Sequence, residues 1–131
     1  MRNFVALFFV LAACGKPPNL ANPCATKGST YFASYVEANN GTCGTMPDAI
    51  VNIKADGTIP GDPLACDANE QDGCTARNTN CKTSSKGTDC SLTTSVTFDS
   101  DGSKAAGLLT LSCVTGNSSC ASTYQVTMLR Q

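Results

Sequence analysis

The fold class follows from residues 92–113, which read LTTSVTFDSDGSKAAGLLTLSC. In residues 92–98 larger side chains alternate with small hydroxyl side chains, so a β-strand here would have one apolar face and one hydroxyl face. The apolar face would carry Leu92, Thr94, Val96 and Phe98. Residues 99–102, DSDG, are typical of a hairpin turn in which Gly102 takes the positive φ. Residues 105–113 predict the returning strand, with Leu109, Leu111 and Cys113 on one face.

Further strands are predicted on both sides of this hairpin. Residues 31–36 are aromatic and β-prone and end at a turn over residues 39–41. Residues 50–53 form another short apolar run, which ends at Asp56-Gly57, and its partner is expected to begin near Thr58. A final strand would place three side chains inward, namely Tyr124, Val126 and Met128. We therefore predict a mainly β fold, an antiparallel meander of about five or six strands with one solvated face, built as a small sandwich or a half-open barrel.

Residues 60–89 have no apolar periodicity and are polar throughout. They contain two prolines and the cysteines Cys66, Cys74 and Cys81. This composition predicts a loop region held by disulfides rather than a part of the core.

The cysteines are the second feature that defines the domain. The chain has nine cysteines and no tryptophan, so its apolar core must be thin and disulfides of about 2–4 kcal/mol each must support it. Leaving Cys14 aside, an even set remains, and we predict that all of these pair: Cys24, Cys43, Cys66, Cys74, Cys81, Cys90, Cys113 and Cys120. The sequence permits many pairings; the simplest hypothesis joins neighbours, as Cys24–Cys43, Cys66–Cys74, Cys81–Cys90 and Cys113–Cys120.

Several functions are disfavoured by what the sequence lacks. The chain contains no histidine, which removes imidazole-based triads, most catalytic zinc sites and histidine ligation of haem. The closest cysteines, Cys74 and Cys81, are too far apart for a CxxC motif. The formal net charge is −1 and the basic residues are scattered, so nucleic acid is not an expected partner. We expect no metal and no cofactor.

Two groups of carboxylates suggest possible sites, one for calcium and one for hydrolysis. Residues 67–73 suggest calcium ligands at Asp67, Asn69, Glu70 and Asp72, although the spacing departs from an EF-hand and also fits a polar turn. Asp99 and Asp101 could serve a hydrolase together with Glu37, Asp48 or Glu70, but a hairpin turn explains this pair of aspartates better.

The N-terminus has the form of an export signal. Arg2 precedes an apolar run over residues 4–13, which as a helix would rise only about 15 Å, half of a hydrocarbon core. The run closes on Leu11-Ala12-Ala13-Cys14, which resembles the lipobox of bacterial lipoprotein precursors. The resemblance implies removal of residues 1–13 and acylation, with palmitate among the acyl chains, at Cys14. The alternative is an ordinary secretory signal with Cys14 free to form a disulfide.

The resemblance also implies a location and an arrangement of the mature chain. Residues 14–23 would be the lipidated cysteine and a flexible tether, and residues 24–131 a single β-rich domain. The residue after Cys14 is Gly15 rather than an acidic residue. By the sorting rules of enterobacterial lipoproteins, this resemblance implies that the protein is anchored in the outer membrane, with its domain in the periplasm or outside the cell. In outline the chain also resembles small cysteine-rich envelope lipoproteins, a likeness that implies no activity.

The function predicted from these features is that of a lipid-anchored, non-catalytic module of the envelope. Its partners would be the membrane, through the anchor, and an envelope protein or glycan. The alternatives are a ligand-binding or enzyme-inhibiting module that uses the loop over residues 60–89, and a hydrolase built on the carboxylates named above.

Overall fold

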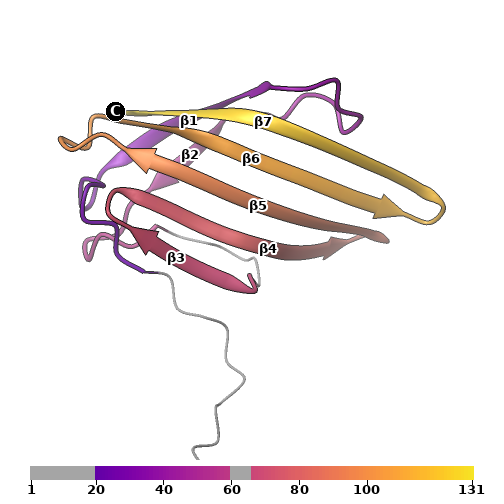
Figure 1. Cartoon of the computed structure of the whole chain (residues 1–131), viewed down its shortest axis with the longest axis horizontal. Coiled ribbons are helices and arrows are strands. Elements are labelled where there is room, and N and C mark those ends of the chain that lie inside the picture. The colour runs from indigo at the N-terminus through magenta and orange to yellow at the C-terminus, as the bar shows by residue number, and fades with distance from the viewer. Residues whose placement is uncertain (1–19, 60–65) are drawn as a thin grey trace, which may run out of the picture.

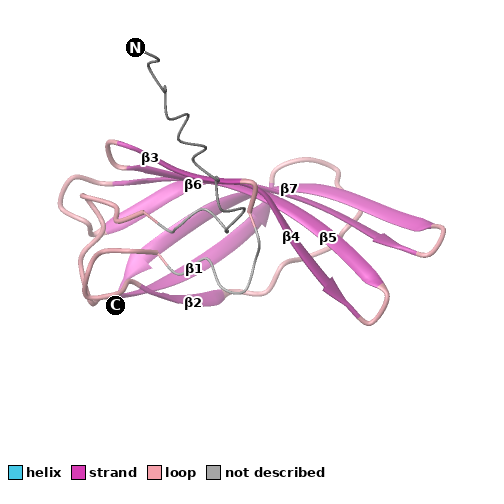
Figure 2. Ribbon diagram, turned by 90° about the horizontal axis from the view of Figure 1, so that it is seen from below, coloured by secondary structure: helices cyan, strands magenta, loops and turns pink. Residues whose placement is uncertain are grey.

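The computed structural model describes residues 20–59 and 66–131, and the elements within them are all strands. The strands are β1 (Thr30–Glu37), β2 (Ala49–Asn52), β3 (Ala68–Asp72), β4 (Thr75–Ser85), β5 (Thr88–Phe98), β6 (Lys104–Thr115) and β7 (Ser118–Arg130). They form one antiparallel sheet in the order β2-β1-β7-β6-β5-β4-β3. The sheet is curled into a half-barrel (Figure 1, Figure 2). The predicted β class and the half-open barrel are thus confirmed.

The hairpin that the sequence predicts most clearly is present, and its two strands face inward with the side chains that the alternation predicts. Leu92 lies opposite Leu111 and Thr94 opposite Leu109, which places the apolar faces of β5 and β6 on the same side of the sheet. Gly102 has a φ of 67° in the turn between them. The strands predicted over residues 31–36 and 50–53 correspond to β1 and β2, but β2 pairs with β1. The partner expected near Thr58 is therefore wrong, since Thr58 forms only an isolated bridge with Ala21.

The prediction that residues 60–89 are a loop region is also wrong. In the described part of this segment, β3 and β4 form a hairpin that extends the sheet beyond β5. The apolar period failed to indicate β4 because a bulge between Asn78 and Cys81 shifts the alternation of its side chains by one residue. Most of its other side chains are polar and exposed or half-buried.

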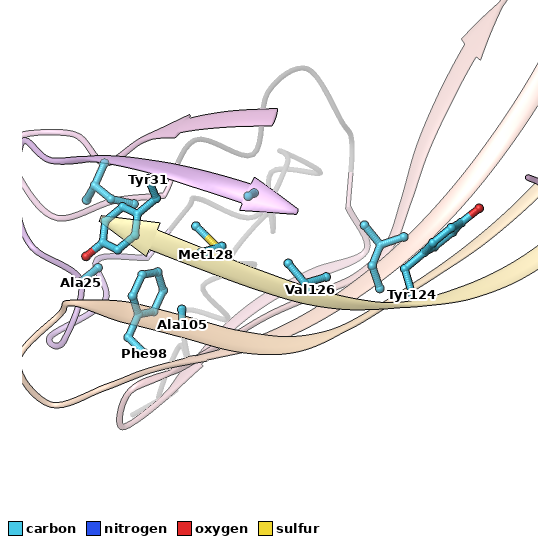
Figure 3. Packing of buried hydrophobic residues seen from close by; sticks show 10 residues of the cluster. Ala25, Tyr31, Phe98, Ala105, Tyr124, Val126 and Met128 are labelled. Carbon is cyan, nitrogen blue, oxygen red and sulfur yellow. The ribbon is translucent and has the colours of Figure 1, made fainter. Parts of the chain in front are cut away.

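The core lies on the inner, concave face of the sheet, near the turn that joins β5 to β6. Tyr31 and Phe98 meet there edge to face, with ring centroids 5.5 Å apart and planes at 84°. Figure 3 shows these rings at one end of a row of buried side chains from β7 that includes Met128, Val126 and Tyr124. The hydroxyl of Tyr31 donates to the carbonyl oxygen of Gly102, which fixes the turn against the core.

Residues 20–23, the described part of the predicted tether over residues 14–23, belong to the domain, and the predicted signal and Cys14 lie outside the described residues. Asn22 is only 1 % exposed, and its side-chain nitrogen donates to Gln71 at 2.8 Å and to the carbonyl oxygen of Cys74 at 3.1 Å. Its side-chain oxygen accepts from the backbone N–H groups of Cys24 and Ala25. The predicted boundary at residue 24 is therefore too late, because the amide of Asn22 fastens this segment to β3.

The substitution Asn22→Ala is expected to lower the free energy of unfolding by about 2 kcal/mol, because it leaves buried donors and acceptors without partners. Denaturant unfolding of the oxidised protein measures this. Asn52→Ala, which removes an exposed bond from Thr30, is the matched control and should cost less than about 0.5 kcal/mol. Equal losses for the two variants would contradict the role given to Asn22.

Candidate functional site

The inner face of the half-barrel contains a cavity of about 140 Å³. Its apolar lining comes from β2, β5, β6 and β7 and from the segment after β2. It includes Val51, Ile59, Val96, Leu109, Val126 and Met128. Gly107 of β6 lies directly between Val96 of β5 and Val126 of β7 in the sheet register. The cross-strand row Val96, Gly107 and Val126 therefore has no side chain at its middle position, and this leaves space for the cavity. A Cβ atom at Gly107 would collide with the carbonyl oxygen of Ser95, so the two backbones require glycine here.

Three polar side chains also line this cavity, and each comes from a different strand: Tyr35 from β1, Asn78 from β4 and Thr94 from β5. Asn78 and Thr94 lie opposite each other in the register. Within the described residues, the side chains of these three residues form no hydrogen bond. The other two tyrosine hydroxyls differ, since Tyr31 donates to Gly102 and Tyr124 donates to the carbonyl oxygen of Gly44 at 2.6 Å.

Tyr35 is held in its neutral form. Burial raises the pKa of its hydroxyl above the usual value, and the nearby carboxylate of Asp48 raises it further. The phenol therefore remains a hydrogen-bond donor at neutral and mildly alkaline pH. Thr94 was predicted on the apolar face of its strand, and a polar residue in that position is the signal by which the sequence could have indicated the cavity.

The outer face of the sheet is rich in hydroxyl groups. Thr93, Thr110 and Thr123 lie side by side on β5, β6 and β7. Two shallow hollows of about 240 Å³ and about 500 Å³ share Ser91 and Ser112 and follow this face toward the far ends of the hairpins. This surface can offer many weak hydrogen bonds, and the charged side chains that line its larger hollow are Lys82 and Asp89 among the described residues.

The predicted participation of the eight cysteines in disulfides is confirmed, but every predicted pair is wrong. The bonds are Cys24–Cys74, Cys43–Cys120, Cys66–Cys81 and Cys90–Cys113. Cys113 lies opposite both Cys90 and Cys120 in the register, and it bonds to Cys90 while Cys120 bonds to Cys43. The Cys66–Cys81 bond joins the segment just before β3 to the middle of β4.

The residues suggested as calcium ligands are not brought together. Glu70 and Asp72 lie on one face of β3 and Asn69 on the other, because side chains alternate along a strand. Glu70 forms an exposed ion pair with Arg77 of β4, and Asp67 accepts a short hydrogen bond from Asn80. The alternative of a polar turn is equally wrong, since these residues form an edge strand. Among the described residues, no three acidic or cysteine side chains group as metal ligands would.

The carboxylates considered for a hydrolase are likewise dispersed. Asp99 forms an ion pair with Lys104 across the β5–β6 turn, and Asp101 accepts from the backbone N–H of Ser103, which lowers its pKa. These contacts confirm the turn. Glu37 instead accepts from the hydroxyl of Ser122, at the end of β1. Within the part of the chain that the structure describes, none of the three hollows above has two carboxylates in its lining.

Comparison with known proteins gives no match: neither a protein-family model, nor a curated protein, nor a solved structure is similar to this chain. Across residues 20–59 and 66–131, no helix has the length and apolar character needed to span a bilayer.

Proposed function

We propose that this protein is a lipoprotein of the bacterial outer membrane, with residues 1–13 as its export signal and Cys14 as the site of its acyl chains. The folded domain would be a non-catalytic module displayed in the periplasm or on the cell surface. One observation carries the proposal: the eight cysteines of the domain bond to one another in four disulfides, so none of them remains as a partner for Cys14.

This pairing weakens the alternative of an ordinary secretory signal. If Cys14 formed a disulfide with a domain cysteine, one of the four internal bonds would have to open. A thiol at the end of a lipobox-like sequence is more readily explained as an acylation site. The internal disulfides also require an oxidising compartment, as export supplies.

The description as a non-catalytic module is supported by the surroundings of the polar side chains. Asp99 and Asp101 form their contacts within the β5–β6 turn, and Glu70 forms an ion pair with Arg77 between β3 and β4. The sequence also contains no histidine to act as a general base.

The shape of the domain suits display from a membrane. The carbonyl oxygen of Leu20 accepts from Gln71 of β3, and Asn22 donates to the β3–β4 turn, whereas the β4–β5 and β6–β7 hairpins turn at the other end of the sheet (Figure 1). The residues from Cys14 to Leu20 can span at most about 20 Å. An anchor at Cys14 would therefore keep the Leu20 end near the lipid and leave the hydroxyl-rich outer face of the hairpins available to an envelope protein or glycan.

The test of the proposal is metabolic labelling of cells with an alkyne fatty acid. The wild-type protein should incorporate the label and fractionate with outer membranes, and Cys14→Ser should abolish the labelling. The control is the pair Cys43→Ala with Cys120→Ala, which removes a disulfide and should leave the labelling intact. An unlabelled wild-type protein, or an intact mass that shows a free amino terminus at residue 14 without acyl chains, would refute the proposal.

A further inference from the structure

The inner cavity resembles a binding site more than a packing defect. Its volume of about 140 Å³ is close to that of engineered apolar cavities, about 150 Å³, that bind benzene. Its lining comes from β1, β2, β4, β5, β6 and β7, so the curl of the sheet shapes it. Binding sites for small molecules have this composition, a largely apolar lining with a few polar groups that fix orientation.

The polar lining provides a second and independent observation. The side chains of Tyr35, Asn78 and Thr94 reach the same cavity from three strands, and none has a hydrogen-bond partner in the described protein. All three residues are half-buried and their polar atoms remain accessible, so a small molecule in the cavity could form hydrogen bonds with them. The adjacent inner positions, Val96 and Val126, are apolar.

We propose that this cavity binds a small neutral alcohol or phenol, with a ring of about the size of benzene and one hydroxyl group. The ring would fill the space over Gly107, between Val96 and Val126. The hydroxyl would accept from Tyr35 and exchange hydrogen bonds with Asn78 and Thr94, whose side chains can both donate and accept.

Charge argues for a neutral ligand. None of the described residues that line the cavity is basic, so a carboxylate would lose its hydration without gaining a charged partner among them. The carboxylate of Asp48 lies close enough to Tyr35 to affect its hydroxyl and would repel an anion there. The proposal therefore predicts discrimination between an alcohol and the acid of the same shape.

The experiment uses the full chain with Cys14→Ser, which avoids lipid and detergent in the cavity. Cyclohexanol is titrated against the isotope-labelled protein, with cyclohexanecarboxylate as the charged counterpart, and amide shifts are followed by NMR. Tyrosine emission gives a second readout, since the chain has three tyrosines and no tryptophan and cyclohexanol is transparent. Saturable shifts at Thr94, Val96 and Val126 are expected with cyclohexanol, and at least tenfold weaker binding with the acid.

Substitutions then test the roles of the polar groups. Tyr35→Phe and Thr94→Val should each weaken cyclohexanol binding about three- to tenfold, the effect of one lost hydrogen bond. Thr127→Val is the matched control, because Thr127 is exposed on the outer face next to Val126, and it should leave the affinity unchanged.

Two outcomes would overturn the proposal. The first is an absence of saturable shifts up to the solubility limit of cyclohexanol, which would mean that water alone fills the cavity. The second is binding that Tyr35→Phe and Thr94→Val both leave unchanged, which would place the ligand elsewhere. Val96→Phe, which fills the cavity, should abolish the shifts; if that variant does not fold, the two milder substitutions still decide.

Discussion

Removal of the Cys43–Cys120 disulfide, by Cys43→Ala together with Cys120→Ala, is expected to lower the free energy of unfolding by about 4 kcal/mol. The bond joins residues 77 apart in sequence. A longer loop loses more entropy when it is closed in the unfolded chain. This bond should therefore stabilise the fold more than any of the other three disulfides, by about 4.5 kcal/mol in the loop-closure model. Denaturant unfolding of the oxidised proteins measures the difference.

The bond also holds a segment that covers the open edge of β7. Beyond the end of β1, the backbone N–H of Ala38 donates to the carbonyl oxygen of Thr123, and that of Thr42 donates to the carbonyl oxygen of Ala121. These bonds occupy groups that would otherwise be exposed along an edge strand. Loss of the disulfide should therefore expose β7 to proteolysis as well as lower stability.

The matched control is the disulfide between Cys66 and Cys81, which are only 15 residues apart. The same model gives about 3 kcal/mol for its removal by paired alanine substitution. A larger loss for Cys66–Cys81 than for Cys43–Cys120 would contradict the argument from loop length.

The pairing shows how far the sequence could predict the fold. The parity of β5, β6 and β7 correctly placed Cys90, Cys113 and Cys120 on one face, and the structure puts Cys113 opposite both Cys90 and Cys120 in the register. The expected Cys113–Cys120 bond was thus geometrically reasonable. What decides the actual pairing is Cys43, which the loop after β1 brings to Cys120. That contact between residues far apart in the chain leaves no local pattern in the sequence.

The lining of the cavity could likewise be predicted only in part, because it also depends on contacts between residues far apart in the chain. Hydrophobic alternation predicts which side of a strand faces inward, so Thr94 could be assigned to the inner face from its neighbours. Asn78 could not, because β4 is largely polar and has a bulge. The approach of Tyr35 to the other two depends on the curl of the sheet, which no single strand specifies.

Phe98→Ala is expected to lower the free energy of unfolding by about 4 kcal/mol. Phe98 is 2 % exposed and packs edge to face on Tyr31, so its removal leaves a large void in a core with few other rings. Because the hydroxyl of Tyr31 also holds the carbonyl oxygen of Gly102, the β5–β6 turn should loosen with the core. Calorimetry or denaturant unfolding gives the loss, and faster amide exchange around the turn would report the loosening.

Phe32→Ala is the matched control, because it makes the same substitution on the opposite face of the sheet. Phe32 is 37 % exposed and lies between Ile50 of β2 and Leu129 of β7 in the register. Its cross-strand contacts are worth about 1 kcal/mol at most. Because a slip of one residue in a strand moves every side chain to the other face, similar losses for the two phenylalanines would mean that the register of β1 or β5 differs from the one described. A loss several times larger at Phe98 would establish which face of the sheet forms the core, and therefore which face can contain the cavity.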